Sequence, residues 1–221
     1  MSPDPKSFLL DERIHSYMLS SSTALDEVER WLISTTAELG PAAGMQISPE
    51  QAIFFRVLTT AMGARRVLEI GTFTGLSTLE FARGVGPGGQ VTTCDISVEW
   101  TAIARQAWDR AGVADRVELH LKPALEFLAD HRPSHAYDIA FLDADKRELV
   151  HQYELVLPLV REGGVILVDN VLWSGRVLDP SDDPDVSAIR QLNDLLVADA
   201  RVDNVLLPIS DGLAFAVKVR S

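Results

Sequence analysis

The chain has 221 residues, of which 47% are hydrophobic and 24% charged, as is ordinary for one globular domain. Its 32 acidic residues outnumber its 20 basic ones and give a net charge of −12, so we expect no nucleic-acid partner, which would need a dense basic surface. No apolar run approaches the roughly 18 residues of a membrane helix. With no recognisable secretory signal and a single cysteine, Cys94, we expect a cytoplasmic protein with no membrane partner.

Helices are predicted in the first sixty residues. Apolar residues recur at helical spacing over 24–39, which predicts one amphipathic helix. A second helix is predicted after Ser48, which suits an N-cap and is followed by Pro49 at the first helical position. Gln51 would complete a capping box with Ser48, and Gly63 would end the helix.

From residue 64 onward, short apolar strands alternate with amphipathic helices. The predicted strands are 66–70, 90–95, 116–121, 137–142, 165–169, 202–207 and 213–219. The predicted helices between them are 77–84, 98–111, 124–130, 146–160 and 184–198. This order implies right-handed βαβ units and a mostly parallel sheet, to which the closing hairpin adds one antiparallel strand. We predict a single α/β domain over 1–221, with an N-terminal helical extension over 1–63 and a core over 64–221.

The first strand ends in a glycine-rich turn. Ligands of parallel sheets bind at the carboxyl ends of the strands, and Gly71 and Gly75 would let the backbone turn tightly there. The spacing is not the G-x-G-x-x-G of a dinucleotide site, and Glu69 would repel a pyrophosphate but suit a cationic ligand. A plain glycine-rich turn explains the same residues equally well.

Acidic residues follow three further strands. Asp95 could accept hydrogen bonds from the ribose hydroxyls of an adenosine, or it could cap the next helix. Asp143 follows the fourth strand, and Asp169 and Asn170 follow the fifth. Neighbouring strand ends would bring these oxygens together as a site for Mg²⁺, with Mn²⁺ or Ca²⁺ as alternatives. Solvated or capping acids are the alternative, which explains Asp145 well but explains the set of Asp143, Asp169 and Asn170 less well, because both strand ends face the same crevice.

Five runs taken together carry a family resemblance: LEIGTFTGLSTL, CDIS, FLDADK, GGVILVDNVLWSG and SDGLAF. They resemble the cation-dependent class I O-methyltransferases, the family of catechol and caffeoyl-coenzyme A O-methyltransferases, including its small bacterial members. The resemblance spans about residues 6–219. It implies a Rossmann-like seven-stranded methyltransferase sheet with helices on both faces, S-adenosylmethionine as the methyl donor and a divalent cation.

The resemblance also implies site residues, by matching motif. The donor-binding positions are matched by Ile47, Glu69, Gly71, Thr72, Ser77, Asp95, Ile96, Ala124 and Asp145. The metal ligands are matched by Asp143, Asp169 and Asn170, and the catalytic lysine by Lys146. Lys6, Trp173 and Ser174 are candidate acceptor contacts.

Some positions depart from the family pattern. Ile47 stands where plant relatives usually carry threonine, and Leu149 and Gln152 stand where relatives often carry tyrosines. Ser174 stands where plant relatives carry an asparagine that contacts the substrate. These departures leave the donor and metal chemistry intact and concern the identity of the acceptor.

The predicted function is metal-dependent transfer of a methyl group to a hydroxyl of a small ortho-diphenol. Lys146 would act as a general base or as a cation that stabilises the phenolate. Trp173 offers a flat apolar wall for an aromatic ring, or it packs into the core. The loop after Asn170 is acidic, which disfavours a coenzyme A ester. The alternatives are a nicotinamide-dependent oxidoreductase and a non-catalytic nucleotide- or metal-binding module.

A homodimer is also predicted. The resemblance implies it, and the first helices carry more apolar residues than a short extension needs to cap one sheet. These residues are Phe8, Leu9, Leu10, Ile14, Tyr17, Met18 and Leu19.

Overall fold

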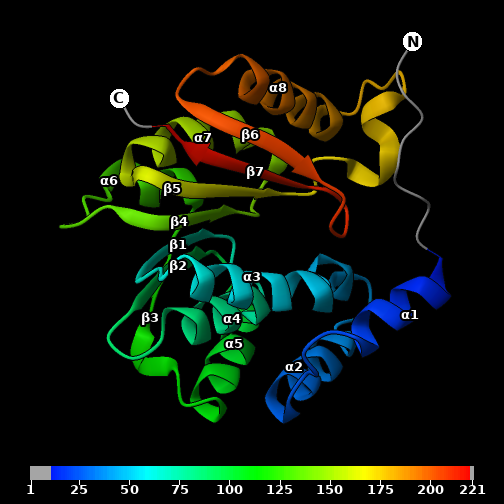
Figure 1. Ribbon diagram of the computed structural model, residues 1–221, viewed down its shortest axis with the longest axis vertical. Helices are drawn as coiled ribbons and strands as arrows, with labels where there is room; N and C mark the ends of the chain where they lie inside the picture. The colour runs from blue at the N-terminus through cyan, green and yellow to red at the C-terminus, as the bar shows by residue number, and fades with distance from the viewer. Residues whose placement is uncertain (1–10, 220–221) are drawn as a thin grey trace.

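The computed structural model describes residues 11–219, and a seven-stranded sheet forms its centre (Figure 1). The strand order is β3-β2-β1-β4-β5-β7-β6. All neighbouring strands pair in parallel except β7, which runs antiparallel to both β5 and β6. The strands are β1 (Arg66–Ile70), β2 (Gln90–Asp95), β3 (Val117–Leu121), β4 (Tyr137–Leu142), β5 (Val160–Asp169), β6 (Val202–Leu207) and β7 (Leu213–Lys218). The predicted fold class is confirmed.

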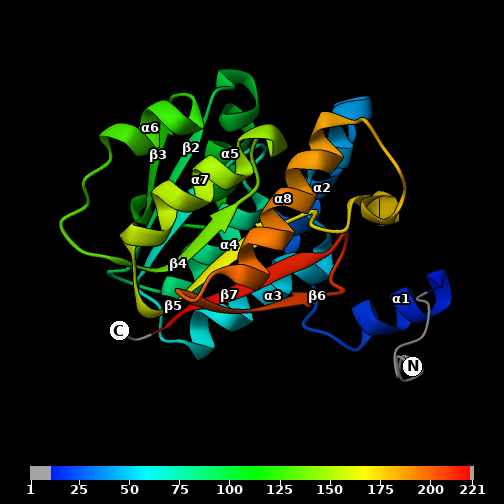
Figure 2. The same cartoon turned by 90° about the horizontal axis from the view of Figure 1, so that it is seen from above.

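Helices cover both faces of this sheet, as the two views show (Figures 1 and 2). On one face lie α6 (Ala124–Asp130), α7 (Leu149–Val156) and α8 (Pro184–Ala198), whose apolar residues pack on β1, β4 and β5. On the other face lie α2 (Glu27–Ala37), α3 (Pro49–Ala61), α4 (Leu76–Val85) and α5 (Val98–Arg110). The remaining helix, α1 (Glu12–Ser20), lies at the margin of the molecule. None of the described helices is long and apolar enough to cross a membrane.

The alternation of side chains along β1 explains why two cores form. Leu68 and Ile70 point into the cluster beneath α7 and α8, whereas Val67 points into the cluster beneath α3 and α4. Successive residues of a strand face opposite sides, so a central strand buried on both sides reads as one apolar run. The polar exception in this run is Glu69, which is fully buried.

The prediction of a single helix over 146–160 is wrong. The segment divides into a 3-10 turn (Lys146–Glu148), α7 and a second 3-10 turn (Leu157–Leu159). Pro158 has no N–H to donate and ends the helix, and β5 begins at Val160, five residues before the predicted strand. Smaller differences are that the strand predicted over 116–121 begins at Val117, the one over 213–219 ends at Lys218, and the helix predicted over 24–39 is shorter at both ends.

The predicted capping box of α3 is half formed. The Ser48 side chain accepts from the Gln51 backbone N–H at 3.4 Å, as an N-cap should. The Gln51 side chain does not return the bond, because it is fully buried on the sheet side of the helix near Asp169. A complete capping box occurs instead at α2, between Asp26 and Glu29.

Candidate active site

A cavity of about 1130 Å³ opens at the carboxyl ends of β1, β2, β4 and β5. This is the edge at which ligands of open parallel sheets bind. Most of the sequence-predicted site residues line it: Ile47, Gly71, Thr72, Ser77, Asp95, Ile96, Ala124, Asp143, Asp145, Lys146, Asp169, Asn170, Trp173 and Ser174. Glu69 is not among the lining residues, and Lys6 lies outside the described residues.

The glycine turn after β1 brings three strand ends together. Gly71 donates its N–H to Cys94 at the end of β2, and Asp143 at the end of β4 donates to Ile70. Gly71 has φ of 101°, and a Cβ there would lie 2.7 Å from the Asp143 carbonyl carbon. A side chain therefore cannot be accommodated, and the turn is held directly beneath the residue predicted to bind metal.

Asp95 organises this turn. Its Oδ2 accepts from the backbone N–H groups of Thr72 at 3.0 Å and Phe73 at 2.8 Å. Its Oδ1 accepts from the Ser97 N–H at 2.8 Å and keeps capacity for a further donor. Ser97, rather than Asp95, is the N-cap of α5, so the helix-capping alternative for Asp95 is wrong. A carboxylate with a spare acceptor site at the cavity wall suits a ligand hydroxyl.

Glu69 lies behind this wall. Its Oε2 accepts hydrogen bonds from the hydroxyls of Thr78 and Thr93, while its Oε1 is buried with no described partner. Burial is the main cause that raises the pKa of Glu69 to about 7. The structure thus places a carboxyl group that titrates near neutrality just beneath the glycine turn.

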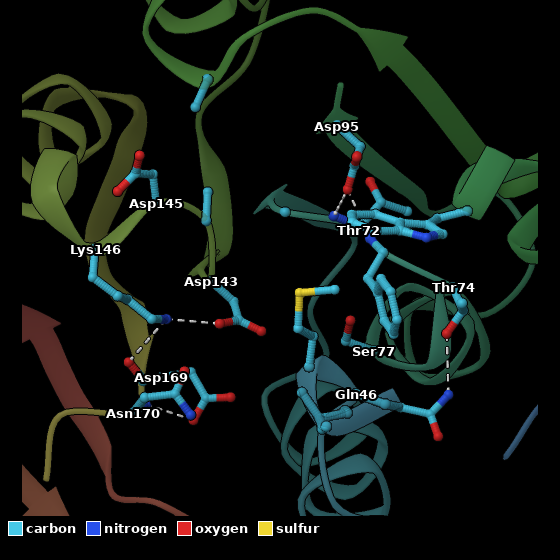
Figure 3. Close-up of a pocket in the computed structure, with 18 of the residues that line it drawn as sticks. Gln46, Thr72, Thr74, Ser77, Asp95, Asp143, Asp145, Lys146, Asp169 and Asn170 are labelled. Atoms are coloured by element: carbon cyan, nitrogen blue, oxygen red, sulfur yellow. Dashed lines mark hydrogen bonds and ion pairs between the residues drawn. The ribbon is translucent and has the colours of Figure 1, made fainter. Parts of the chain in front are cut away.

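The segment before α3 borders the cavity next to the glycine turn. Gln46 donates from Nε2 to the hydroxyls of Thr36 on α2 and Thr74 in the glycine turn, at 2.8 and 3.1 Å. Figure 3 shows the bond from Gln46 to Thr74, and the neighbours of Gln46 in the chain, Met45 and Ile47, line the cavity. Ile47 itself lines the cavity and is 8% exposed.

Across the cavity, four residues form a polar group (Figure 3). The Lys146 ammonium donates to Asp143 Oδ1 at 2.8 Å and to the Asp169 carbonyl oxygen at 3.5 Å. Asp169 is 3% exposed, and its Oδ1 accepts from the Asn170 N–H at 2.8 Å. Burial and the nearby charge of Asp143 raise the pKa of Asp169 to about 7, against the opposing effect of Lys146.

The donor set of this group fits a hard divalent cation. Two carboxylates and one carboxamide converge without histidine or cysteine, and oxygen ligands are those that Mg²⁺, Mn²⁺ and Ca²⁺ prefer. Burial is the largest cause of the raised pKa of Asp169, and the negative charge of Asp143 adds to it. Further positive charge between Asp143 and Asp169 would stabilise both as carboxylates.

Backbone strain is concentrated at the cavity. Five described residues other than glycine have positive φ, and all five line the cavity: Phe73, Asn170, Trp173, Ser174 and Ser210. Such conformations cost about 1–3 kcal/mol each and persist where the surrounding structure enforces them. Trp173 is half-buried, and it both packs against the core and lines the cavity, so the two interpretations of this residue combine.

Comparison with known proteins identifies the family. A family model described as O-methyltransferase matches residues 18–219. A relative from Dictyostelium discoideum, named as a probable caffeoyl-CoA O-methyltransferase, is 41% identical over 211 residues, which cover 93% of this chain and 91% of the relative. The chain belongs to the O-methyltransferase family. The resemblance predicted from the sequence and the enzyme class are therefore confirmed.

Two further relatives of this O-methyltransferase bear on its site. A catechol O-methyltransferase of Mycobacterium tuberculosis is 44% identical over 161 residues, which cover 72% of this chain and 70% of that protein. The crystal structure of an O-methyltransferase from Bacillus cereus in complex with SAH is 35% identical, covers 93% of this chain and 97% of the other, and has a TM-score of 0.85.

Several lining residues of this O-methyltransferase were not predicted from the sequence. They include Gln46, Phe73, Trp100, Lys122, Glu148, Asp185, Ser210 and Asp211. Phe73 and Trp100 meet edge to face, with their ring centroids 5.1 Å apart. This aromatic pair could have been found from the sequence, because Phe73 lies in the glycine turn and Trp100 lies in the helix after Asp95. Asp211, by contrast, reaches the cavity only because the turn between β6 and β7 folds against it, and no local sequence pattern predicts this.

Proposed function

We propose that this O-methyltransferase transfers the methyl group of S-adenosylmethionine to a hydroxyl of a small ortho-diphenol. Asp143, Asp169 and Asn170 would hold a divalent cation, with Mg²⁺ the first candidate. The observation that carries this proposal is one cavity bordered on one side by Asp95 and the glycine turn, and on the other by the Asp143–Lys146–Asp169 group. The known structure of the Bacillus cereus relative in complex with SAH supports the choice of donor.

The residues around the turn are suited to bind the donor. The free acceptor capacity of Asp95 suits a ribose hydroxyl, and Ile96 and Ala124 flank the space beyond it. The backbone at Gly71 lies against that of Asp143, and Ser77 and Thr72 also line the cavity. A donor bound in this order would direct its methionine end at Asp143.

The reaction moves one methyl group from sulfur to oxygen, so a C–S bond breaks, a C–O bond forms and the hydroxyl proton leaves. When bound, the cation would lower the pKa of the diphenol hydroxyl and orient its oxygen. Lys146 lies at Asp143 with a side chain only 9% exposed, so its ammonium is well placed to stabilise the phenolate, whereas only its neutral amine form could take that proton. The rest of the task is alignment of oxygen with the methyl group.

The acceptor side supports a small planar substrate. Trp173 supplies an apolar wall, and the acidic residues Glu148, Asp185 and Asp211 also line the cavity. Arg176 lines it too, but its guanidinium already pairs with Asp183 at 2.6 Å. This acidic lining offers little attraction to the phosphates of a coenzyme A ester.

Labelled-methyl transfer from S-adenosylmethionine to a panel of catechols, caffeoyl-coenzyme A and flavonoids tests this proposal. We expect free catechols to be methylated with the highest kcat/KM, and Trp173→Ala to raise their KM while leaving the donor dissociation constant unchanged. Transfer to no ortho-diphenol would contradict the function, and a strong preference for caffeoyl-coenzyme A would contradict the proposed acceptor size.

We also propose a homodimer. Helix α1 buries none of its residues, and Tyr17 and Met18 on it are 71% and 38% exposed. A nine-residue helix is not stable in water by itself, so a second copy of the chain would supply the missing contact. Light scattering should give twice the chain mass, and Tyr17→Asp with Met18→Asp should shift it toward one chain, whereas the exposed control Glu27→Gln should not. A monomer mass for the unmodified protein would contradict this.

A further inference from the structure

The loop that follows β5 holds a conformation that its own residues disfavour. Trp173, Ser174 and Gly175 have φ of 45°, 52° and 81° in succession. Two of these three residues carry side chains, for which the left-handed region is unfavourable. Local backbone bonds from Trp173 to Asn170 and from Gly175 to Leu172 hold the two ends of this segment. Contacts from elsewhere in the fold hold it as well, and together they decide where Trp173 and Ser174 stand at the cavity.

The turn between β6 and β7 makes these contacts. The Val171 N–H donates to the Gly212 carbonyl and the Leu172 N–H to the Asp211 carbonyl, both at 3.1 Å. Gly212 fits here because it lacks a side chain, since a Cβ would lie 2.9 Å from the Leu172 backbone nitrogen. These backbone contacts fix the loop up to Leu172, just before the left-handed segment begins.

One side-chain contact reaches into the segment itself. The Asp211 carboxylate accepts a hydrogen bond from the backbone N–H of Ser174, the middle residue of the three. Further along the loop, Arg190 on α8 donates to the carbonyl oxygens of Val177 at 2.8 Å and Arg176 at 3.2 Å. The segment Trp173–Gly175 thus lies between two anchors, and Asp211 is the anchor beside the cavity.

We propose that Asp211 is a positioning residue for acceptor specificity, which holds Trp173 and Ser174 against the acceptor side of the cavity. This inference rests on the proposed function, because it assumes that the acceptor lies beside Trp173. A carboxylate is a strong acceptor for a backbone N–H, and the bond holds the chain where two side-chain-bearing residues are left-handed. Without it, the segment can relax toward ordinary φ values and move Trp173.

Two other roles for Asp211 would also make it important. It lines the cavity, so its charge could act on the acceptor directly. It could also merely stabilise the hairpin that carries β7. The three roles differ in which substitution is tolerated and in whether the Ser174 amide is protected, so one pair of variants separates them.

The experiment compares Asp211→Ala with Asp211→Asn, and with Asp203→Ala as an exposed control on β6. Asparagine keeps an oxygen that accepts from Ser174 but loses the charge. We expect Asp211→Ala to raise the acceptor KM about tenfold, with kcat and the donor dissociation constant little changed. Asp211→Asn and Asp203→Ala should both stay within about twofold of the unmodified enzyme.

Hydrogen exchange at the Ser174 amide gives a readout that does not depend on methyl transfer. We expect exchange to be faster in Asp211→Ala and still slow in Asp211→Asn. Unchanged exchange in Asp211→Ala would overturn the proposal, even if no acceptor were methylated. If Asp211→Ala and Asp211→Asn raise the acceptor KM equally while the Ser174 amide stays protected, the charge of Asp211 acts on the acceptor directly and the proposal is wrong. If the variants lose stability without a change in KM, the role of Asp211 is purely structural.

Discussion

Gly71→Ala is the substitution that tests most sharply how the two halves of the site are joined. The added Cβ would overlap the Asp143 carbonyl group and lie 3.1 Å from the Ala144 nitrogen, and φ at this position is 101°. Strain of a side chain at such a φ costs about 1–3 kcal/mol, and overpacking against backbone costs about 1–3 kcal/mol more. We therefore expect the free energy of unfolding to fall by about 2–6 kcal/mol.

Gly112→Ala is the matched control. Gly112 also has a positive φ, at 64°, but a Cβ there would meet no atom within 4 Å. Gly112→Ala should therefore lower the free energy of unfolding only by the cost of backbone strain, about 1 kcal/mol. Denaturant unfolding of both variants gives the difference, and calorimetry with S-adenosylhomocysteine should show weaker binding for Gly71→Ala. Equal stabilities together with unchanged binding would refute the close contact between the turn and Asp143.

Three further predictions concern individual carboxylates. Asp95→Ala should weaken S-adenosylhomocysteine binding by about 1.5–3 kcal/mol, and an unchanged dissociation constant in calorimetry would refute the ribose assignment. Asp169→Ala should abolish divalent-cation binding measured by calorimetry while sparing donor affinity; retained cation binding would argue against this ligand. Burial raises the pKa of Glu80 to about 7, so the folded chain binds the extra proton and the free energy of unfolding falls as pH rises from about 4.5 to 7. The free energy of unfolding measured at pH 5 minus that at pH 8 should be smaller in Glu80→Gln than in the unmodified protein, by up to about 3 kcal/mol. An identical pH dependence in both proteins would contradict this prediction.

Residue types and spacing were enough to predict the strands and the residues at their ends. Apolar runs such as Val67–Ile70 interrupted by turn residues marked parallel strands, and β1, β2, β4 and β6 have the predicted bounds. The convergence of Asp143 with Asp169 followed from the placement of β4 beside β5. The motif resemblance then supplied the donor and the lysine, which spacing alone would not have.

What the sequence did not predict depends on contacts between distant segments. Gln51 looked like a capping residue, but its burial near Asp169 arises from how α3 packs on the sheet. Glu69 was assigned to the cavity wall, although the Thr78 and Thr93 hydroxyls hold it behind that wall. The link from Asp211 to Ser174 joins residues 37 positions apart, which no local pattern encodes. The division of the chain at residue 63 stays a prediction.

Cation removal and restoration tests the central claim most directly. The initial rate of methyl transfer to a free catechol would be measured after exhaustive chelation, and again after stepwise addition of Mg²⁺. The arrangement of Asp143, Asp169 and Asn170 predicts a rate that falls to background and returns with saturable dependence on Mg²⁺. Full turnover after chelation, with no divalent metal found by elemental analysis of the protein, would contradict the account.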